Sequence, residues 1–172
     1  MEVEPSSDAS TSTFDAFFRA NYANMTSYAR ARLRDDSSAE ELVQEAFVRL
    51  VTLWDKVLSA THPRAYAYAV LRNNISDHFR RSRRSPTRSL DATEEGPSGD
   101  GGIGDAELSV VILDLLDQLP SRQREVVYLR FVGDLTNREI AELLGLSERT
   151  VAVHLHRSLK ALRVMLSADE AR

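Results

Sequence analysis

Residues 135–163 read LTNREIAELLGLSERTVAVHLHRSLKALR, and this stretch predicts two helices joined by a tight turn. Thr136 and Glu139 have the spacing of a capping box, Gly145 can form the turn, and Ser147 can cap the second helix. The stripe expected to be buried on the second helix consists of Val151, Leu155, Leu159 and Leu162. This pattern is typical of the helix-turn-helix, whose second helix enters the DNA major groove by its N-terminal turns.

The second helix has a basic outer face. Between Ser147 and Arg163 there are four Lys/Arg residues and one acid. The alternative is a plain helical hairpin with a solvated face, but the cap, the turn glycine and the one-sided basic charge together favour DNA. The residues expected to contact duplex DNA are Arg149, Thr150, Ala152, Val153, His156, Arg157 and Lys160.

The net charge of −4 hides an uneven distribution along the 172 residues. Residues 13–89 hold 13 Lys/Arg against eight Asp/Glu, whereas residues 90–106 hold five acids and no base. The basic charge peaks in the stretch FRRSRR at 79–84, which could neutralise phosphates and release counterions. The overall charge therefore does not exclude a nucleic-acid partner.

The glycine-rich acidic stretch EEGPSGDGGIGD at 94–105 is expected to be a linker. Apolar residues on both sides recur at helical spacing, with no sustained alternation, so we expect an all-α chain of two small helical domains. The expected organisation is a disordered acidic tail (1–13), a helical bundle (14–88), an acidic linker (89–106), a helix-turn-helix domain (107–166) and a short tail (167–172).

Three long helices are predicted in the first domain. One starts at Phe14 and ends near Leu33; the next is capped by Ser38 and continues to Val57; the third starts near Pro63 and ends before Pro86. The polar side of the second helix carries Glu40, Glu41, Gln44, Glu45 and Arg49.

Before the helix-turn-helix, the second domain is expected to begin with a helix from about Ala106 that Pro120 stops. Ser121 is expected to cap the following helix, which would end at Gly133. Its inward residues are predicted to be Val126, Val127, Leu129 and Phe131.

Several classes of protein are excluded by composition. Cysteine is absent, which excludes disulfides and thiolate metal sites and suits a cytoplasmic location. No stretch is long and apolar enough for a membrane span or a signal peptide. His154 and His156 lie two apart on different sides of a helix, so we expect no metal site. The sequence has no G-x-S-x-G motif and no phosphate-binding glycine loop, so we expect no cofactor and no enzyme.

Aromatic residues accompany the basic end of the first domain. His62, Tyr66 and Tyr68 precede FRRSRR, and aromatic rings beside a basic groove are used to bind single-stranded DNA, since every base can stack. Tyr66 fits a core position equally well.

Two blocks in the first domain resemble the extracytoplasmic-function sigma factors of bacteria. SAEELVQEAFVRLVTLWDKV at 38–57 is similar to the helix by which these factors bind the coiled coil of the largest polymerase subunit. RNNISDHFRRSRR at 72–84 is similar to the region that melts and reads the upstream promoter hexamer. The resemblance implies polymerase binding by Glu40, Glu41, Gln44 and Glu45. It implies promoter melting and single-strand binding by His62, Tyr66, Arg72, Asn73, Asp77, Arg80 and Arg84, with Tyr66 standing where the family has tryptophan.

A third block, residues 119–163, resembles the region of these factors that reads the distal promoter element as duplex. The resemblance implies core RNA polymerase and promoter DNA as partners, and an anti-sigma protein that masks both faces until a stress signal arrives. The stretch SERTVAVHL at 147–155 also resembles the DNA-binding domain of response regulators, and a simple transcriptional regulator is the alternative function. That alternative explains nothing before residue 119.

Overall fold

A computed structural model describes residues 7–33, 35–84 and 115–169. These ranges form helices and turns and contain no strand, which confirms the predicted all-α fold class. The chain divides into two compact units, Met1–Arg84 and Ser85–Arg172. The linker expected at 89–106 and the start of the helix expected before Pro120 lie outside the described residues.

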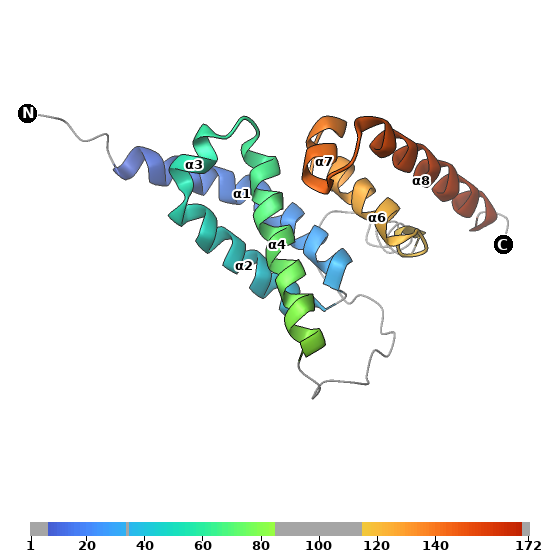
Figure 1. Cartoon of the computed structure of the whole chain (residues 1–172), viewed down its shortest axis with the longest axis horizontal. Helices are drawn as coiled ribbons and strands as arrows, with labels where there is room; N and C mark the ends of the chain where they lie inside the picture. The colour runs from blue at the N-terminus through green and yellow to red at the C-terminus, as the bar shows by residue number, and fades with distance from the viewer. Residues whose placement is uncertain (1–6, 34, 85–114, 170–172) are drawn as a thin grey trace, which may run out of the picture. The chain divides into compact units, whose positions relative to one another are not determined.

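Three long helices and one short helix form the first unit: α1 (Ser7–Leu33), α2 (Asp36–Thr52), α3 (Trp54–Ser59) and α4 (Pro63–Arg84). Helices α1, α2 and α4 pack against one another, and α3 packs against α2 and α4 (Figure 1). Because α1 already begins at Ser7, residues 7–13 are helical, and the expectation of a disordered tail up to residue 13 is wrong there.

Aromatic side chains join α1 to α2 and α3. Phe14 and Phe17 pack edge-to-face on Trp54 at 5.1 and 5.3 Å between ring centroids, and Phe18 meets Phe47 at 4.8 Å. Edge-to-face pairs at these distances contribute about 0.5–1.5 kcal/mol each beyond the area they bury. The N-terminal half of α1 is therefore held on the bundle by directional contacts.

The start and the end of α2 differ from the predicted bounds. Asp35, rather than Ser38, is the N-cap: its carboxylate accepts a hydrogen bond from the Ser38 backbone N–H at 3.3 Å, and hydrogen bonding by Ser38 lowers the pKa of Asp35. The predicted continuous helix to Val57 is broken at Leu53, whose φ of −109° and ψ of 21° depart from helical values. The break starts α3 at Trp54, whose ring is buried under Phe14 and Phe17.

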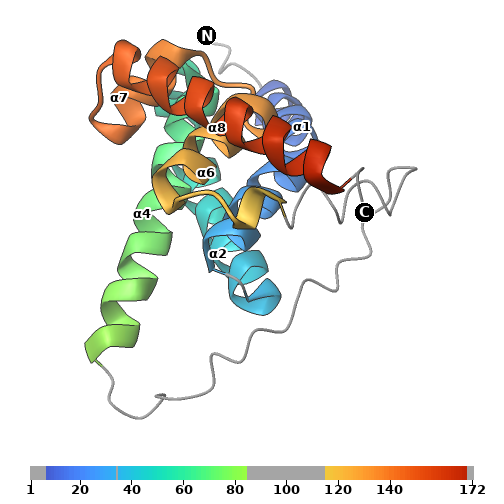
Figure 2. The ribbon, with the colours of Figure 1, turned by 90° about the vertical axis from the view of Figure 1, so that its right-hand side faces the viewer.

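In the second unit, the described residues begin with helical residues 115–117, which end before Pro120 as predicted. They are followed by α6 (Ser121–Val127), the π-helical segment η1 (Tyr128–Val132), α7 (Asn137–Leu144) and α8 (Glu148–Asp169). Pro120 is the N-cap of α6 and Ser121 its first helical residue, with no side-chain cap, so the cap predicted at Ser121 is wrong. Both α6 and α7 pack against α8 (Figure 2). Since α8 extends to Asp169, residues 167–169 are helical and not part of a tail.

The π-helical turn explains why Phe131 was wrongly predicted to face inward. The Gly133 N–H donates to the Tyr128 carbonyl at 2.8 Å, a bond across five residues instead of four. The wider turn adds one residue and so shifts the helical phase by about 100°. Phe131 is accordingly 59% exposed, while Leu129 remains buried as predicted.

Helix α8 buries a different position from the one predicted. Val151 is fully buried, but Leu159 is 49% exposed, and the neighbouring Ser158 is buried in its place. The Ser158 hydroxyl donates to the His154 carbonyl at 2.8 Å, which satisfies the polar group inside the core. A small residue at this position lets α8 approach α6 closely.

Candidate nucleic-acid interface

The predicted single-strand-binding residues share one side of α4. Helical residues spaced three, four or seven apart lie on the same side, and six of the seven predicted residues have this spacing. They are Tyr66, Asn73, Asp77, Arg80 and, by its backbone position, Arg84, together with His62, which directly precedes α4. Arg72 lies at the flank of this outward stripe and is half-buried. The opposite side of α4 is in the core, where Ala67, Leu71 and Ile75 are buried.

The two tyrosines of α4 have different environments. Tyr68 is buried and packs edge-to-face on Tyr28 at 5.4 Å. Tyr66 is half-buried on the outward stripe. Of the two rings, Tyr66 is the one with a surface that a base could stack on.

Positive charge gathers at the C-terminal turns of α4, which stand away from α1 and α2 (Figure 2). Arg80, Arg81 and Arg83 are exposed. The Arg80 guanidinium donates to the Asp77 carboxylate at 2.7 Å, an exposed pair that contributes at most about 1 kcal/mol to stability but orients the arginine along the stripe. A phosphate could displace or join this contact.

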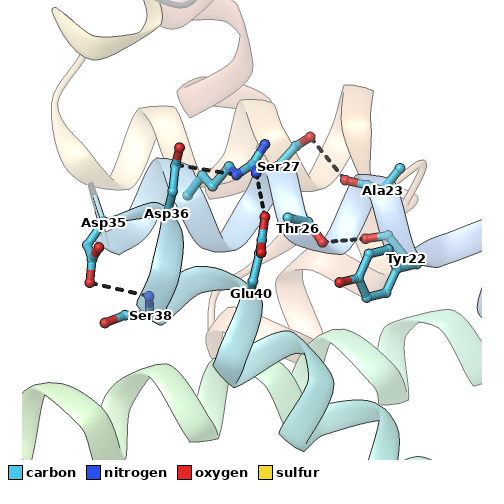
Figure 3. Close-up of polar contacts among 9 residues, drawn as sticks. Tyr22, Ala23, Thr26, Ser27, Asp35, Asp36, Ser38 and Glu40 are labelled. Atoms are coloured by element: carbon cyan, nitrogen blue, oxygen red, sulfur yellow. Dashed lines mark hydrogen bonds and ion pairs between the residues drawn. The ribbon is translucent and has the colours of Figure 1, made fainter. Parts of the chain in front are cut away.

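The polar side of α2 is exposed at Glu41, Gln44 and Glu45. Glu40 is engaged within the unit: its carboxylate accepts from Arg30 at 2.8 Å, and the same guanidinium contacts Asp36 at 3.3 Å (Figure 3). Arg30 thus joins α1 to the first turns of α2. The acidic charge that this face can offer a partner lies at Glu41 and Glu45.

The helix-turn-helix is formed by α7, the turn at Gly145 and α8. Thr136 and Glu139 make the predicted capping box, with the Thr136 N–H donating to the Glu139 carboxylate at 2.7 Å. Gly145 has a φ of +65°, which favours glycine, although a Cβ placed there would meet nothing within 4 Å. The Ser147 hydroxyl accepts from the Thr150 N–H at 3.1 Å, as predicted for the cap of α8.

The outer face of α8 carries six of the seven predicted duplex-contacting residues. All six are exposed: Arg149, Ala152, Val153, His156, Arg157 and Lys160. Thr150 is half-buried, and its hydroxyl is hydrogen-bonded to Ser147 at 2.7 Å, so it belongs to the helix cap. No acid occurs between Arg149 and Ser167, which leaves this face with the positive potential that phosphates attract.

Membrane spans and metal clusters are both absent from the described part of the chain. No helix there has the length and apolar character needed to cross a bilayer. No group of three or more His, Asp or Glu side chains lies close enough there to hold a metal ion.

One buried polar residue was missed at sequence level. Asn74, next to the predicted Asn73, is only 2% exposed and is hydrogen-bonded to α2. Its position on the core side of α4, one helical turn from Leu71, could have indicated a buried amide in need of partners.

Comparison with known families matches both units. Residues 17–85 match "Sigma-70 region 2" and residues 109–162 match "Sigma-70, region 4". The chain is 30% identical over 159 residues to the RNA polymerase sigma-E factor of Streptomyces coelicolor, covering 91% of this chain and 88% of that protein. It is also 30% identical over 168 residues to the ECF RNA polymerase sigma factor SigL of Mycobacterium tuberculosis, covering 95% and 94%.

Two solved structures share the fold. The sigma factor RpoE of Bartonella quintana, in complex with the anti-sigma factor NepR, aligns with a TM-score of 0.70 at 18% identity, covering 91% of this chain and 98% of that one. CnrH, in complex with the cytosolic domain of CnrY, aligns with a TM-score of 0.60 at 22% identity, covering 92% and 90%. The match at 17–85 accounts for the first unit, which the response-regulator alternative does not explain.

Proposed function

Because the chain belongs to the extracytoplasmic-function sigma factors of the sigma-70 family, we propose that α2, α4 and α8 divide its work between polymerase, single-stranded DNA and duplex DNA. The chain is an RNA polymerase sigma factor. Such factors act by binding, and we assign no catalytic residue. Their polymerase works on the chromosome, so the site of action is the bacterial cytoplasm.

The outward stripe of α4 is the observation that carries the assignment of promoter opening. Tyr66 and Asn73 lie on the same side of the helix as Arg80, so unstacked bases of one strand can meet the first two while the arginine holds a phosphate. Unstacking costs a few kcal/mol per base, and stacking on an aromatic ring returns about 1–3 kcal/mol. The cost and the gain of promoter opening are therefore similar in free energy, and opening depends on polymerase.

Helix α8 supplies duplex specificity. Arg149, in the first turn, and His156, about two turns further on, are assigned to base edges, and Arg157 and Lys160 to phosphates that fix the register. Each mismatched base pair is expected to cost about 1–3 kcal/mol.

An anti-sigma factor is the expected regulator, since the RpoE relative described above was solved with one. Its target would be the same exposed faces of α2, α4 and α8 that polymerase and DNA require. Covering them would keep the factor inactive until a signal releases it.

The function is tested by adding the purified chain to core polymerase from its own host and transcribing fragmented genomic DNA. Mapped 5′ ends should share two spaced upstream motifs. Duplex binding without any new start would contradict sigma activity.

Charge reversal on α2 tests the polymerase-binding face. Glu41→Lys should abolish co-purification with core polymerase and leave the helical circular dichroism spectrum unchanged, because Glu41 is exposed and outside the core. The matched control is Asp15→Lys, the same charge change at an exposed position of α1, which should bind normally. Equal binding by both variants would remove α2 from the interface.

Truncation of Asn73 tests promoter opening. Asn73→Ala should lose permanganate reactivity of the upstream hexamer on duplex promoter DNA, because the exposed amide no longer holds a flipped base. A template with a preformed mismatch bubble should restore transcription. Normal melting by Asn73→Ala would show that the outward stripe does not bind the opened strand.

A further inference from the structure

The buried amide of Asn74 joins the two helices to which polymerase and single-stranded DNA binding are assigned. Its Oδ1 accepts a hydrogen bond from Nη1 of Arg49 at 2.9 Å, and its Nδ2 donates to the Leu42 carbonyl at 3.4 Å. Leu42 and Arg49 both belong to α2 and lie seven residues apart. One side chain of α4 is therefore attached to two residues of α2 that lie about two helical turns apart.

The residues of this attachment are close in the sequence to the residues assigned to polymerase and single-stranded DNA. On α2, Leu42 and Arg49 flank Gln44 and Glu45 in the sequence. On α4, Asn74 adjoins Asn73 and is three residues before Asp77, the partner of Arg80. Any shift of α4 along α2 would thus move the outward stripe relative to the polymerase-binding face.

Apolar packing alone does not fix such a shift closely. Val43, Ala46, Leu71 and Ile75 are buried in the core, and the hydrophobic contribution of such residues is non-directional. A buried amide with both ends engaged has one favourable position, and displacing it leaves a polar group unsatisfied. The Asn74 amide therefore adds directional contacts between these two helices.

We propose that Arg49 and Asn74 are positioning residues that lock α4 in register on α2, so that polymerase bound to α2 holds the outward stripe of α4 where the DNA strand separates. This inference rests on the proposed function. It predicts that the two residues matter for opening DNA and not for binding polymerase.

The test uses the full chain with core polymerase at a promoter mapped from its own run-off transcription. Arg49→Met and Asn74→Leu should each lower the permanganate-detected open fraction on duplex DNA by about tenfold, the effect of losing roughly 1.4 kcal/mol. Affinity for core polymerase, measured by competition with the wild-type chain, should change by less than about threefold, a difference well under that loss. A premelted bubble template should restore transcription by both.

A double-variant cycle separates a joint role from two independent ones. If the residues act through their mutual bond, Arg49→Met with Asn74→Leu should be no worse than the more defective single variant. Arg19→Met, which removes an exposed arginine from α1, is the control for loss of positive charge and should open DNA normally.

Four results would overturn the inference: wild-type opening by Arg49→Met, multiplied defects in the double variant, equal loss of polymerase affinity and opening, or no recovery on the bubble template. Arg49 is exposed, so its variant remains informative even if Asn74→Leu does not fold. Failure of the wild-type chain to open DNA would instead contradict the proposed function, and Asn73→Ala run in parallel distinguishes the two.

Discussion

At the scale of single residues, Tyr68 combines deep burial with a hydroxyl that has no hydrogen-bond partner in the described part of the chain. Burial raises the pKa of its phenol, because the charged form is poorly solvated inside the bundle. A buried hydroxyl without a partner costs free energy that a phenylalanine would not.

Tyr68→Phe should therefore leave the free energy of unfolding at pH 7 unchanged or raise it, by up to about 1 kcal/mol. A raised pKa in the folded state means that stability is fully present below the unfolded pKa of about 10 and falls as the pH rises above it. Because phenylalanine has no ionisable hydroxyl, Tyr68→Phe should lose the part of the destabilisation at alkaline pH that Tyr68 causes. Urea unfolding at pH 7 and at about pH 10.5 measures both effects, and a variant less stable at pH 7 would reveal a partner for the hydroxyl.

At the scale of helices, the adjacent residues Ser158 and Leu159 show which side of α8 is buried. Ser158 is buried with Val151, whereas Leu159 is 49% exposed. The hydrophobicity of the leucine misled the sequence-based prediction, and the serine satisfies its own hydroxyl within the helix.

The two neighbours should respond in opposite ways to substitution. Ser158→Leu should overpack the contact between α8 and α6 and destabilise the unit by about 1–3 kcal/mol. Leu159→Gln should stay within about 0.5 kcal/mol of wild type, as expected at an exposed position. Thermal unfolding of the two variants compares their stabilities directly. A larger loss of stability in Leu159→Gln than in Ser158→Leu would mean that Leu159 is a core residue.

The helices of this chain were predicted from the sequence more accurately than their boundaries and buried positions. The capping box, the glycine turn and the Ser147 cap follow from local chemistry and are confirmed. The break at Leu53 and the π-helical turn were not predictable, because tertiary packing of Trp54 and a change of helical phase leave no local signal. The outward side of α4 was only partly predictable from the sequence. Asn73 and Asn74 are adjacent residues of the same type, and they differ only in the side of the helix on which they lie.

At the scale of the whole molecule, the chain consists of two compact units with separate cores. The order and spacing of the three sequence blocks predicted both the two-unit organisation and the sigma-factor family. Both units match that family. The residue-level assignments on α2, α4 and α8 stay predictions.

Residues 1–84, produced alone, should fold and bind core polymerase, because the face of α2 assigned to polymerase and its supporting core lie within the first unit. A cooperative thermal transition and co-purification with core polymerase are the expected results. The fragment should not select promoters by their distal element, which is assigned to α8. An unfolded fragment would mean that the first unit depends on the second.

The π-helical turn η1 determines what the deletion of one residue would do to the second unit. A turn of this kind holds one residue more than an α-helical turn, so loss of one residue there would give an ordinary α-helical turn. Deletion of one residue between Tyr128 and Val132 would keep α6 intact and rotate the chain that follows by about 100°. Because α8 packs against α6, such a deletion would force α7 and α8 to repack on α6, so the length of η1 fixes how the helix-turn-helix is aimed.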